Sequence, residues 1–248
     1  MTPHWITAFI DLPEESFEAG ADFWSAVTGC SRSPQRGEHG QFATLVPPSG
    51  TDHLRVQRVR DGRPRVHLDL SVDDLATAAV EASRLGATVV DRPYDDVTIM
   101  RSPFGMMFCL VTGAAGVRTP PAEWPGGHAS LVDQVCLDIP PASYAEECDF
   151  WQRLTGWELV HREGSEFSSL VRPMGMPLRL LLQRLDEGGG PVTAHLDLAT
   201  TNRPSEVRRH EALGATVLRT HEHFTVLRDP VGSIYCVTDR DPGTGLIG

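Results

Sequence analysis

The sequence contains no lysine, so all 22 of its lysine-plus-arginine residues are arginine. This absence excludes Schiff-base catalysis, covalent attachment of pyridoxal phosphate and phosphate binding through a P-loop lysine. Acidic residues outnumber these bases 33 to 22, and the formal net charge is −11. Nucleic acids and anionic membranes are bound through clustered cations, so we expect neither as a partner.

Cysteine is scarce and unpatterned, with five residues and no C-x-x-C spacing. An odd number without that spacing indicates neither a disulfide framework nor a zinc ribbon. The chain also lacks an apolar run of about 18 residues, the length that crosses a bilayer. Its first residues lack the basic and apolar regions of a signal peptide. We therefore expect a reduced, cytoplasmic protein.

The two halves of the chain repeat one another. The motif Asp-Phe-Trp-x-x-x-Thr-Gly at residues 22–29 recurs at 149–156, and His-Leu-Asp-Leu at 67–70 recurs at 195–198. Leu-Gly-Ala-Thr at 85–88 likewise recurs at 213–216. A nearly constant offset along a whole half-chain indicates a duplicated domain. We expect domains at 1–114 and 129–241, a linker at 115–128 rich in proline and glycine, and a tail at 242–248.

Each repeat divides again into two similar modules. In the first repeat, alternating apolar residues predict a strand at 5–12, and helical spacing predicts a helix at 14–27 that stops at Gly29. Strands at 41–46 and 54–59 follow. A second cycle comprises a strand at 66–72, a helix at 73–85 capped by Asp73 and ended by Gly86, and strands at 88–90, 97–102 and 106–111. The sequence therefore predicts an α+β fold of four β-α-β-β-β modules.

This order of motifs resembles the vicinal oxygen chelate superfamily, which contains glyoxalases, bleomycin-resistance proteins and extradiol dioxygenases. The resemblance rests on the motifs above and on the Asp-Pro-Val-Gly turn at 229–232 that precedes an aromatic-Cys strand. It covers nearly the whole chain and implies two tandem glyoxalase-like domains. Each domain would curl its sheet around a cavity with ligand positions on the concave face.

The resemblance also implies where metal ligands would lie. In the first repeat the four matched positions are Thr7, Gln57, His67 and Cys109. In the second repeat they are Gln134, Gln183, His195 and Cys236. A catalytic divalent ion usually has about three protein ligands, mostly histidine and carboxylate, and neither set contains a carboxylate. We therefore expect no metal cofactor, with a divalent ion near His67 or His195 as the alternative.

The two histidines also have alternative roles. Each lies two residues before an aspartate, Asp69 or Asp197, so each pair shares one face of a strand. The pairs can serve proton transfer in a cavity or can stabilise the scaffold. Cys109 and Cys236 could be activated thiolates, but their apolar neighbours favour a structural role.

We expect the protein to bind a small organic molecule in a concave cavity and to act by enclosing it. Whether the protein is an enzyme stays open. The expected binding residues are Thr7, Phe9, Gln57, His67, Cys109, Gln134, Gln183, His195, Asp197 and Cys236. The alternative is a lyase, isomerase or dioxygenase, either metal-dependent with an atypical ligand set or metal-free with His195 as base. A third possibility is a fold retained for association. The chain would be a monomer with internal pseudo-twofold symmetry or a homodimer.

Overall fold

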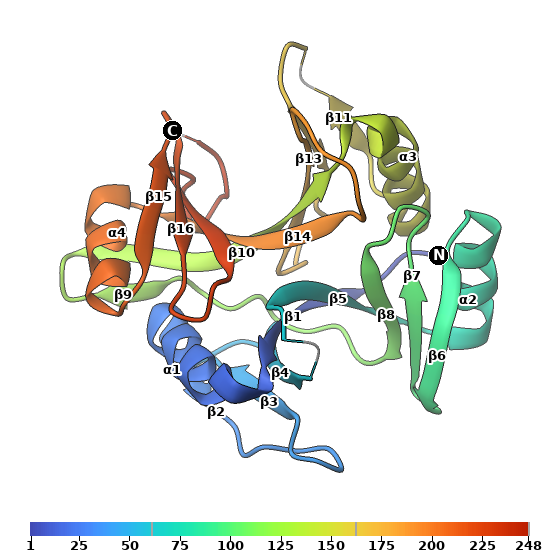
Figure 1. Cartoon of the computed structure of the whole chain (residues 1–248), viewed down its shortest axis with the longest axis horizontal. Coiled ribbons are helices and arrows are strands. Elements are labelled where there is room, and N and C mark those ends of the chain that lie inside the picture. The colour runs from blue at the N-terminus through green and yellow to red at the C-terminus, as the bar shows by residue number, and fades with distance from the viewer. Residues whose placement is uncertain (61, 162, 248) are drawn as a thin grey trace. The chain divides into compact units, whose positions relative to one another are not determined.

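The computed structural model describes residues 1–60, 62–161 and 163–247. It contains the four β-α-β-β-β modules that the sequence predicts, in an α+β fold (Figure 1). A short strand, β9 (Ala122–Trp124), lies within the segment expected to be a linker and pairs antiparallel with the beginning of the next strand, β10 (His128–Ile139). None of the described helices has the length and apolar character needed to traverse a membrane.

The first repeat supplies two modules. The first module consists of β1 (Trp5–Pro13), α1 (Phe17–Thr28), β2 (Ser31–Arg32), β3 (Phe42–Val46) and β4 (Leu54–Val59). The second consists of β5 (Arg65–Val72), α2 (Leu75–Arg84), β6 (Thr88–Tyr94), β7 (Val97–Arg101) and β8 (Met107–Thr112).

The second repeat has the same order. The third module consists of β10, α3 (Tyr144–Thr155), β11 (Leu159–His161), β12 (Phe167–Leu170) and β13 (Arg179–Arg184). The fourth consists of β14 (Thr193–Thr200), α4 (Arg203–Ala212), β15 (Thr216–Thr220), β16 (Phe224–Arg228) and β17 (Ile234–Thr238).

Local sequence signals explain where the helices begin and end. Gly29 ends α1 with φ of 69°, and Gly156 ends α3 with φ of 71°. This left-handed conformation carries little penalty only for glycine. The predicted cap of α2 was wrong by one residue: Asp74, not Asp73, accepts a hydrogen bond from the backbone N–H of Thr77 at 2.8 Å.

Strands from both modules of a repeat join one mixed sheet. The hydrogen-bonded order is β2-β3-β4-β1-β5-β8-β7-β6 in the first repeat and β11-β12-β13-β10-β14-β17-β16-β15 in the second. Within each repeat the first strand of the second module runs parallel to its last strand: β5 pairs with β8, and β14 pairs with β17. These parallel pairs carry the candidate site described below.

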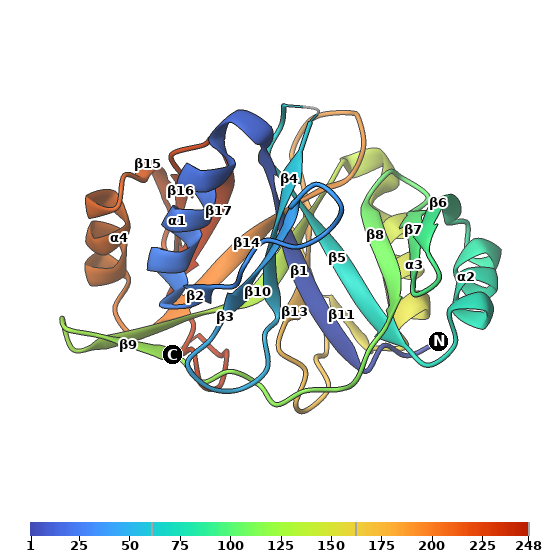
Figure 2. The same ribbon diagram turned by 90° about the horizontal axis from the view of Figure 1, so that it is seen from below.

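The chain forms two compact units that do not coincide with the two sequence repeats. Compact unit 1 comprises residues 1–8, 67–116 and 135–194, and compact unit 2 comprises residues 9–66, 117–134 and 195–248. Each compact unit therefore combines one module of the first repeat with one module of the second. In compact unit 1, α2 packs beside β6, β7 and β8, and in compact unit 2, α4 packs beside β15, β16 and β17 (Figure 2).

The repeated Asp-Phe-Trp motif builds the core of each compact unit. In compact unit 2, the rings of Phe23 and Trp24 on α1 lie 6.0 and 5.2 Å from that of Tyr235 on β17. In compact unit 1, Phe150 and Trp151 on α3 lie 6.1 and 5.4 Å from Phe108 on β8.

These edge-to-face and tilted contacts bury large aromatic surfaces. The helix of one repeat thus packs against the last strand of the other.

Candidate metal centre

In compact unit 2, three potential ligands converge where β14 and β17 run side by side. Asp197 on β14 is directly paired with Cys236 on β17, and His195 shares the strand face of Asp197. The Nε2 atom of His195 lies 3.3 Å from Oδ1 of Asp197 and 3.5 Å from Sγ of Cys236. One donor atom from each residue lies within 4.8 Å of the other two. The group thus combines an imidazole, a carboxylate and a thiol.

Two further side chains position the carboxylate of Asp197. Its Oδ2 atom accepts a hydrogen bond from Nε2 of Gln134 at 2.5 Å and lies 3.8 Å from Nη1 of Arg240. Arg240 in turn donates to the fully buried Asp133. These contacts leave Oδ1 directed toward His195. Outer hydrogen bonds of this kind fix the orientation of a ligand and tune its basicity.

The electrostatic surroundings favour the charged form of Asp197. Burial by itself raises the pKa of this carboxyl. However, the hydrogen bond and charge of His195, together with Arg240 and Gln134, outweigh burial and lower the pKa below its ordinary value. Asp197 is only 3% exposed. It is therefore a buried carboxylate that its neighbours keep in the charged form.

Compact unit 1 contains the corresponding group on β5 and β8. Asp69 is paired with Cys109, and Nε2 of His67 lies 3.8 Å from Oδ1 of Asp69. Burial raises the pKa of the Cys109 thiol, and the hydrogen bond from His67 opposes this shift only in part. At the offset of 127, Thr7 stands where the second repeat has Gln134, and Gly113 stands where it has Arg240. The first repeat thus lacks both side chains that position Asp197.

The group of His195, Asp197 and Cys236 fits a divalent cation. Zinc is bound at about 2.0–2.1 Å by histidine nitrogen and at about 2.3 Å by cysteine sulfur, with tetrahedral geometry. Ligand atoms around such an ion are about 3.3–3.6 Å apart. His195 lies 3.3 Å from Asp197 and 3.5 Å from Cys236, in agreement with this spacing. A carboxylate and a thiolate would also balance the double positive charge.

The expectation that the chain uses no metal is therefore wrong. It assumed one ligand for each matched family position and found no carboxylate there. The structure adds Asp69 and Asp197, which lie two residues beyond the histidines on the same strand face and reach the same donor groups. Cys109 and Cys236, whose apolar neighbours favour a structural role, belong to these same two groups.

The other expected binding residues have varied surroundings. In compact unit 2, Phe9 packs edge-to-face on Phe42 at 6.2 Å, Arg55 lies 5.7 Å from the Phe9 ring, and Gln57 is paired with Phe42 across β3 and β4. In compact unit 1, Thr7 is buried.

In the same compact unit, the amide of Gln183 contacts two other side chains. It donates to Glu166 at 3.1 Å and lies 3.8 Å from Sγ of Cys136. Their roles in binding remain predictions.

Two residues of the centre were missing from the predicted site. The His-x-Asp spacing in the sequence marks Asp69, but this residue is not among the expected binding residues. Arg240 lies beyond the last strand, and no local motif identifies it. Its position beside Asp133 and Asp197 depends on the tertiary structure.

The fold of this chain is similar to those of several solved structures. The Mn(II)-bound glyoxalase from Novosphingobium aromaticivorans is similar in structure, with a TM-score of 0.68 and 17% identity over 99% of this chain and 86% of that one. The 2,2',3-trihydroxybiphenyl 1,2-dioxygenase from Sphingomonas wittichii strain RW1 has a TM-score of 0.60 and 16% identity over 94% and 88%. Among curated proteins the sequence has no match.

The sequence profile of the Glyoxalase-like domain matches residues 7–111 and again residues 134–238. These two matches cover most of the chain and correspond to its two repeats. The four modules, the parallel strand pairs and the duplicated His-x-Asp motif are the structural counterparts of this duplication. The chain belongs to the glyoxalase-like domain family, within the vicinal oxygen chelate superfamily, and carries two copies of the domain.

Proposed function

We propose that this protein is a metal-dependent enzyme that binds a divalent cation at His195, Asp197 and Cys236 and acts on a small organic molecule. The observation that carries the proposal is the convergence of imidazole, carboxylate and thiol within 4.8 Å in compact unit 2. Three protein ligands leave a coordination position open, as catalytic sites require. The Mn(II)-bound glyoxalase of similar fold is consistent with this reading.

The donor set favours zinc or a cation of similar softness. Thiolate is a soft ligand, whereas magnesium, calcium and manganese prefer oxygen ligands. When bound, such an ion supplies Lewis acidity that polarises a carbonyl oxygen or lowers the pKa of a bound water. Zinc has no redox chemistry, so a lyase or isomerase is favoured over an oxygen-dependent dioxygenase.

The chain's own residues prepare this site. Gln134 and Arg240 hold Oδ2 of Asp197, which keeps Oδ1 directed toward the other donors. Because Asp197 remains deprotonated, it does not have to lose a proton before a cation binds. The first repeat lacks the counterparts of Gln134 and Arg240. We therefore assign the working centre to the second repeat.

We propose as substrate an uncharged or weakly charged molecule with neighbouring oxygen atoms. Support comes from the dioxygenase of similar fold, whose name specifies a trihydroxybiphenyl. The net charge of −11 disfavours strongly anionic substrates away from the cation. The oxygen atoms of such a substrate would be suitable ligands for a cation held by His195, Asp197 and Cys236.

Metal binding can be tested on the full-length protein purified without chelators. We expect about one zinc ion per chain by elemental analysis and, after replacement by cobalt, a near-ultraviolet charge-transfer band from the Co–thiolate bond. Cys236→Ser should abolish the band and His195→Ala should weaken binding strongly, whereas Cys148→Ser, which alters a buried cysteine outside the donor groups, should change neither.

The competing outcomes are distinct. A cobalt band lost in Cys109→Ser but retained in Cys236→Ser would move the centre to the first repeat. Absence of bound metal, together with no cobalt band at millimolar cobalt, would refute the proposal. With metal bound, turnover of a carbonyl or hydroxyl substrate accompanied by oxygen consumption would refute the lyase or isomerase assignment.

A further inference from the structure

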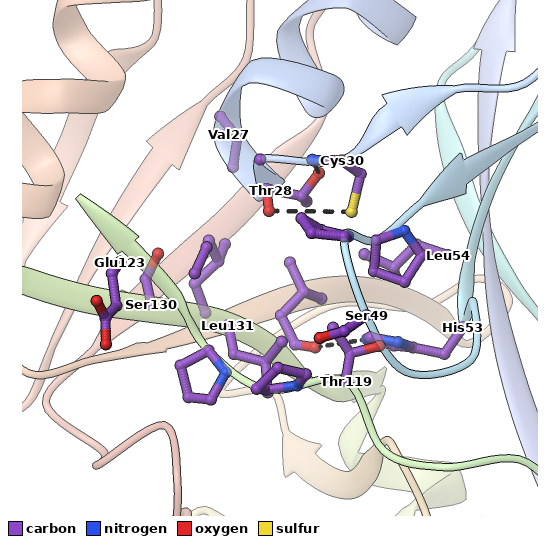
Figure 3. A pocket seen from close by; sticks show the side chains of 18 of the residues that line it. Val27, Thr28, Cys30, Ser49, His53, Leu54, Thr119, Glu123, Ser130 and Leu131 are labelled. Atoms are coloured by element: carbon purple, nitrogen blue, oxygen red, sulfur yellow. Dashed lines mark hydrogen bonds between the residues drawn. The ribbon is translucent and has the colours of Figure 1, made fainter.

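A cavity lies in compact unit 2, and it is distinct from the candidate metal centre. Its volume is about 330 Å³, and it is enclosed by the end of α1, the segment before β4, residues 119–124 and the beginning of β10 (Figure 3). None of the donor residues of the metal centre lines it. Leu198 does line it, and this residue follows Asp197 on β14 and so points to the opposite face of that strand. This volume lies within the range of small-molecule sites.

The wall of this cavity is rigid and mostly apolar. Four prolines contribute to it, in the dipeptides at 47–48 and 120–121, and proline has a fixed φ. The indole of Trp124 is another part of the wall and is held from two sides. The guanidinium of Arg209 lies 3.5 Å from its ring centroid, and Nε1 donates to Oγ of Ser130 at 2.9 Å. A flat aromatic surface is thus fixed in place, which reduces the entropy lost on binding.

The polar groups of the cavity favour an uncharged ligand. His53 is only 4% exposed, and its Nε2 donates to the carbonyl of Val132 at 3.0 Å. Burial lowers the pKa of His53, so its ring is neutral at pH 7. Among the described residues that line the cavity, Glu123 is the only one with a full charge. None of the described lining residues is a cation, and the guanidinium of Arg209 lies against the Trp124 ring without being part of the lining.

We propose that this cavity is a second ligand site, which binds a flat, uncharged, mainly apolar molecule of the size of a bicyclic aromatic, stacked on Trp124. The site is separate from the metal centre and does not depend on it. Its chemistry differs as well, since the metal centre selects oxygen ligands and this cavity offers apolar contact.

The proposal can be tested with 5-fluoroindole, observed by ¹⁹F NMR in the presence of the full-length protein. We expect saturable binding with a dissociation constant of about 1 mM or lower, a modest value for a ligand of this size. Indole-3-carboxylate has the same ring system with a negative charge and should bind at least about tenfold more weakly because no cation lines the cavity. Binding to the folded protein should also raise its melting temperature.

Two substitutions at one position locate the ligand. Cys30 lines the cavity near Thr28 (Figure 3). Cys30→Phe should fill the space and abolish binding, whereas the nearly isosteric Cys30→Ser should leave it unchanged. If Cys30→Phe does not fold, intermolecular nuclear Overhauser effects between bound 5-fluoroindole and the Trp124 side chain give the location in the unaltered chain. Absence of saturable binding, equal binding of the carboxylate, or binding retained in a folded Cys30→Phe protein would overturn the proposal.

Discussion

Replacing Glu206 by glutamine tests a buried carboxylate of compact unit 2 that contacts an arginine and two histidines. This carboxylate is fully buried, and its oxygen atoms accept hydrogen bonds from Nε and Nη2 of Arg209 at 2.9 and 2.7 Å. The Nε2 atoms of His128 and His210 lie 2.8 and 3.0 Å away. Burial alone raises the pKa of Glu206, but the hydrogen bonds of Arg209 and His210 outweigh it and hold the pKa far below its ordinary value.

The expected loss of stability is large because glutamine cannot reproduce this arrangement. Its amide group would present N–H bonds where Glu206 presents an acceptor, opposite donors from Arg209 and the histidines. Breaking one partner of a buried ion pair costs about 3–5 kcal/mol. The Arg209 side chain is 17% exposed, so partial solvation favours the lower value, about 3 kcal/mol. For a chain of this size that corresponds to a fall of about 6–12 °C in melting temperature.

Urea unfolding followed by tryptophan fluorescence and scanning calorimetry would measure this loss. Glu222→Gln is the matched control, because the Glu222 side chain is 87% exposed and its replacement should change the free energy of unfolding by less than about 0.5 kcal/mol. A Glu206→Gln protein within about 1 kcal/mol of the parent would refute the reasoning. Arg209 also stacks on Trp124, so the same substitution should weaken binding of 5-fluoroindole.

Three further predictions concern pH and backbone conformation. Burial lowers the pKa of His53 and His210, so the unfolded chain takes up protons at a higher pH than the folded protein does. The free energy of unfolding should therefore fall as pH decreases below about 6.5, by up to about 1.4 kcal/mol per pH unit for each histidine. A urea midpoint that stays constant between pH 7 and 5 would contradict this. Burial raises the pKa of Glu147, whose carboxyl group accepts a hydrogen bond from Trp151. The parent protein should therefore lose stability relative to Glu147→Gln as pH rises above about 4.5. A constant difference in the free energy of unfolding between the two proteins from pH 4 to 8 would refute this prediction. Gly156→Ala places an alanine in the left-handed conformation and should lower the free energy of unfolding by about 1–2 kcal/mol. Gly164 has the same φ of 71° but lies in a turn, so Gly164→Ala measures the cost of the same backbone conformation away from a helix end.

Much of the fold could be predicted from the sequence because helices and strands are indicated by local patterns of residues. Helix ends at Gly29 and Gly86 require only a residue that tolerates positive φ, and both have it. Alternation of apolar residues likewise identifies strands without knowledge of their partners. His67 and His195 were identified by the repeated His-Leu-Asp-Leu motif and by the family resemblance. The error at Asp73 reflects two adjacent aspartates, either of which could have capped α2.

The metal centre was only partly predictable, for a different reason. Family positions indicated His195 and Cys236, but ligand sets depend on which atoms meet in space. Asp197 enters the group because β14 and β17 are parallel and place it opposite Cys236. Arg240 and His53 carry no local pattern, since their roles come from Asp133 and Val132, which are distant in the sequence.

By itself the sequence determined the duplication, the order of the four modules and the residue types available for chemistry. These features follow from the local spacing of residues and from the repetition of motifs. Only the tertiary structure decided which repeat supplies each helix to each core. Phe23 and Trp24 could have packed on Phe108 as readily by composition as on Tyr235, since apolar burial is not directional. In the folded chain, α1 packs on β17, and Phe23 and Trp24 therefore contact Tyr235. The tertiary structure likewise brings together the histidine, aspartate and cysteine of β14 and β17.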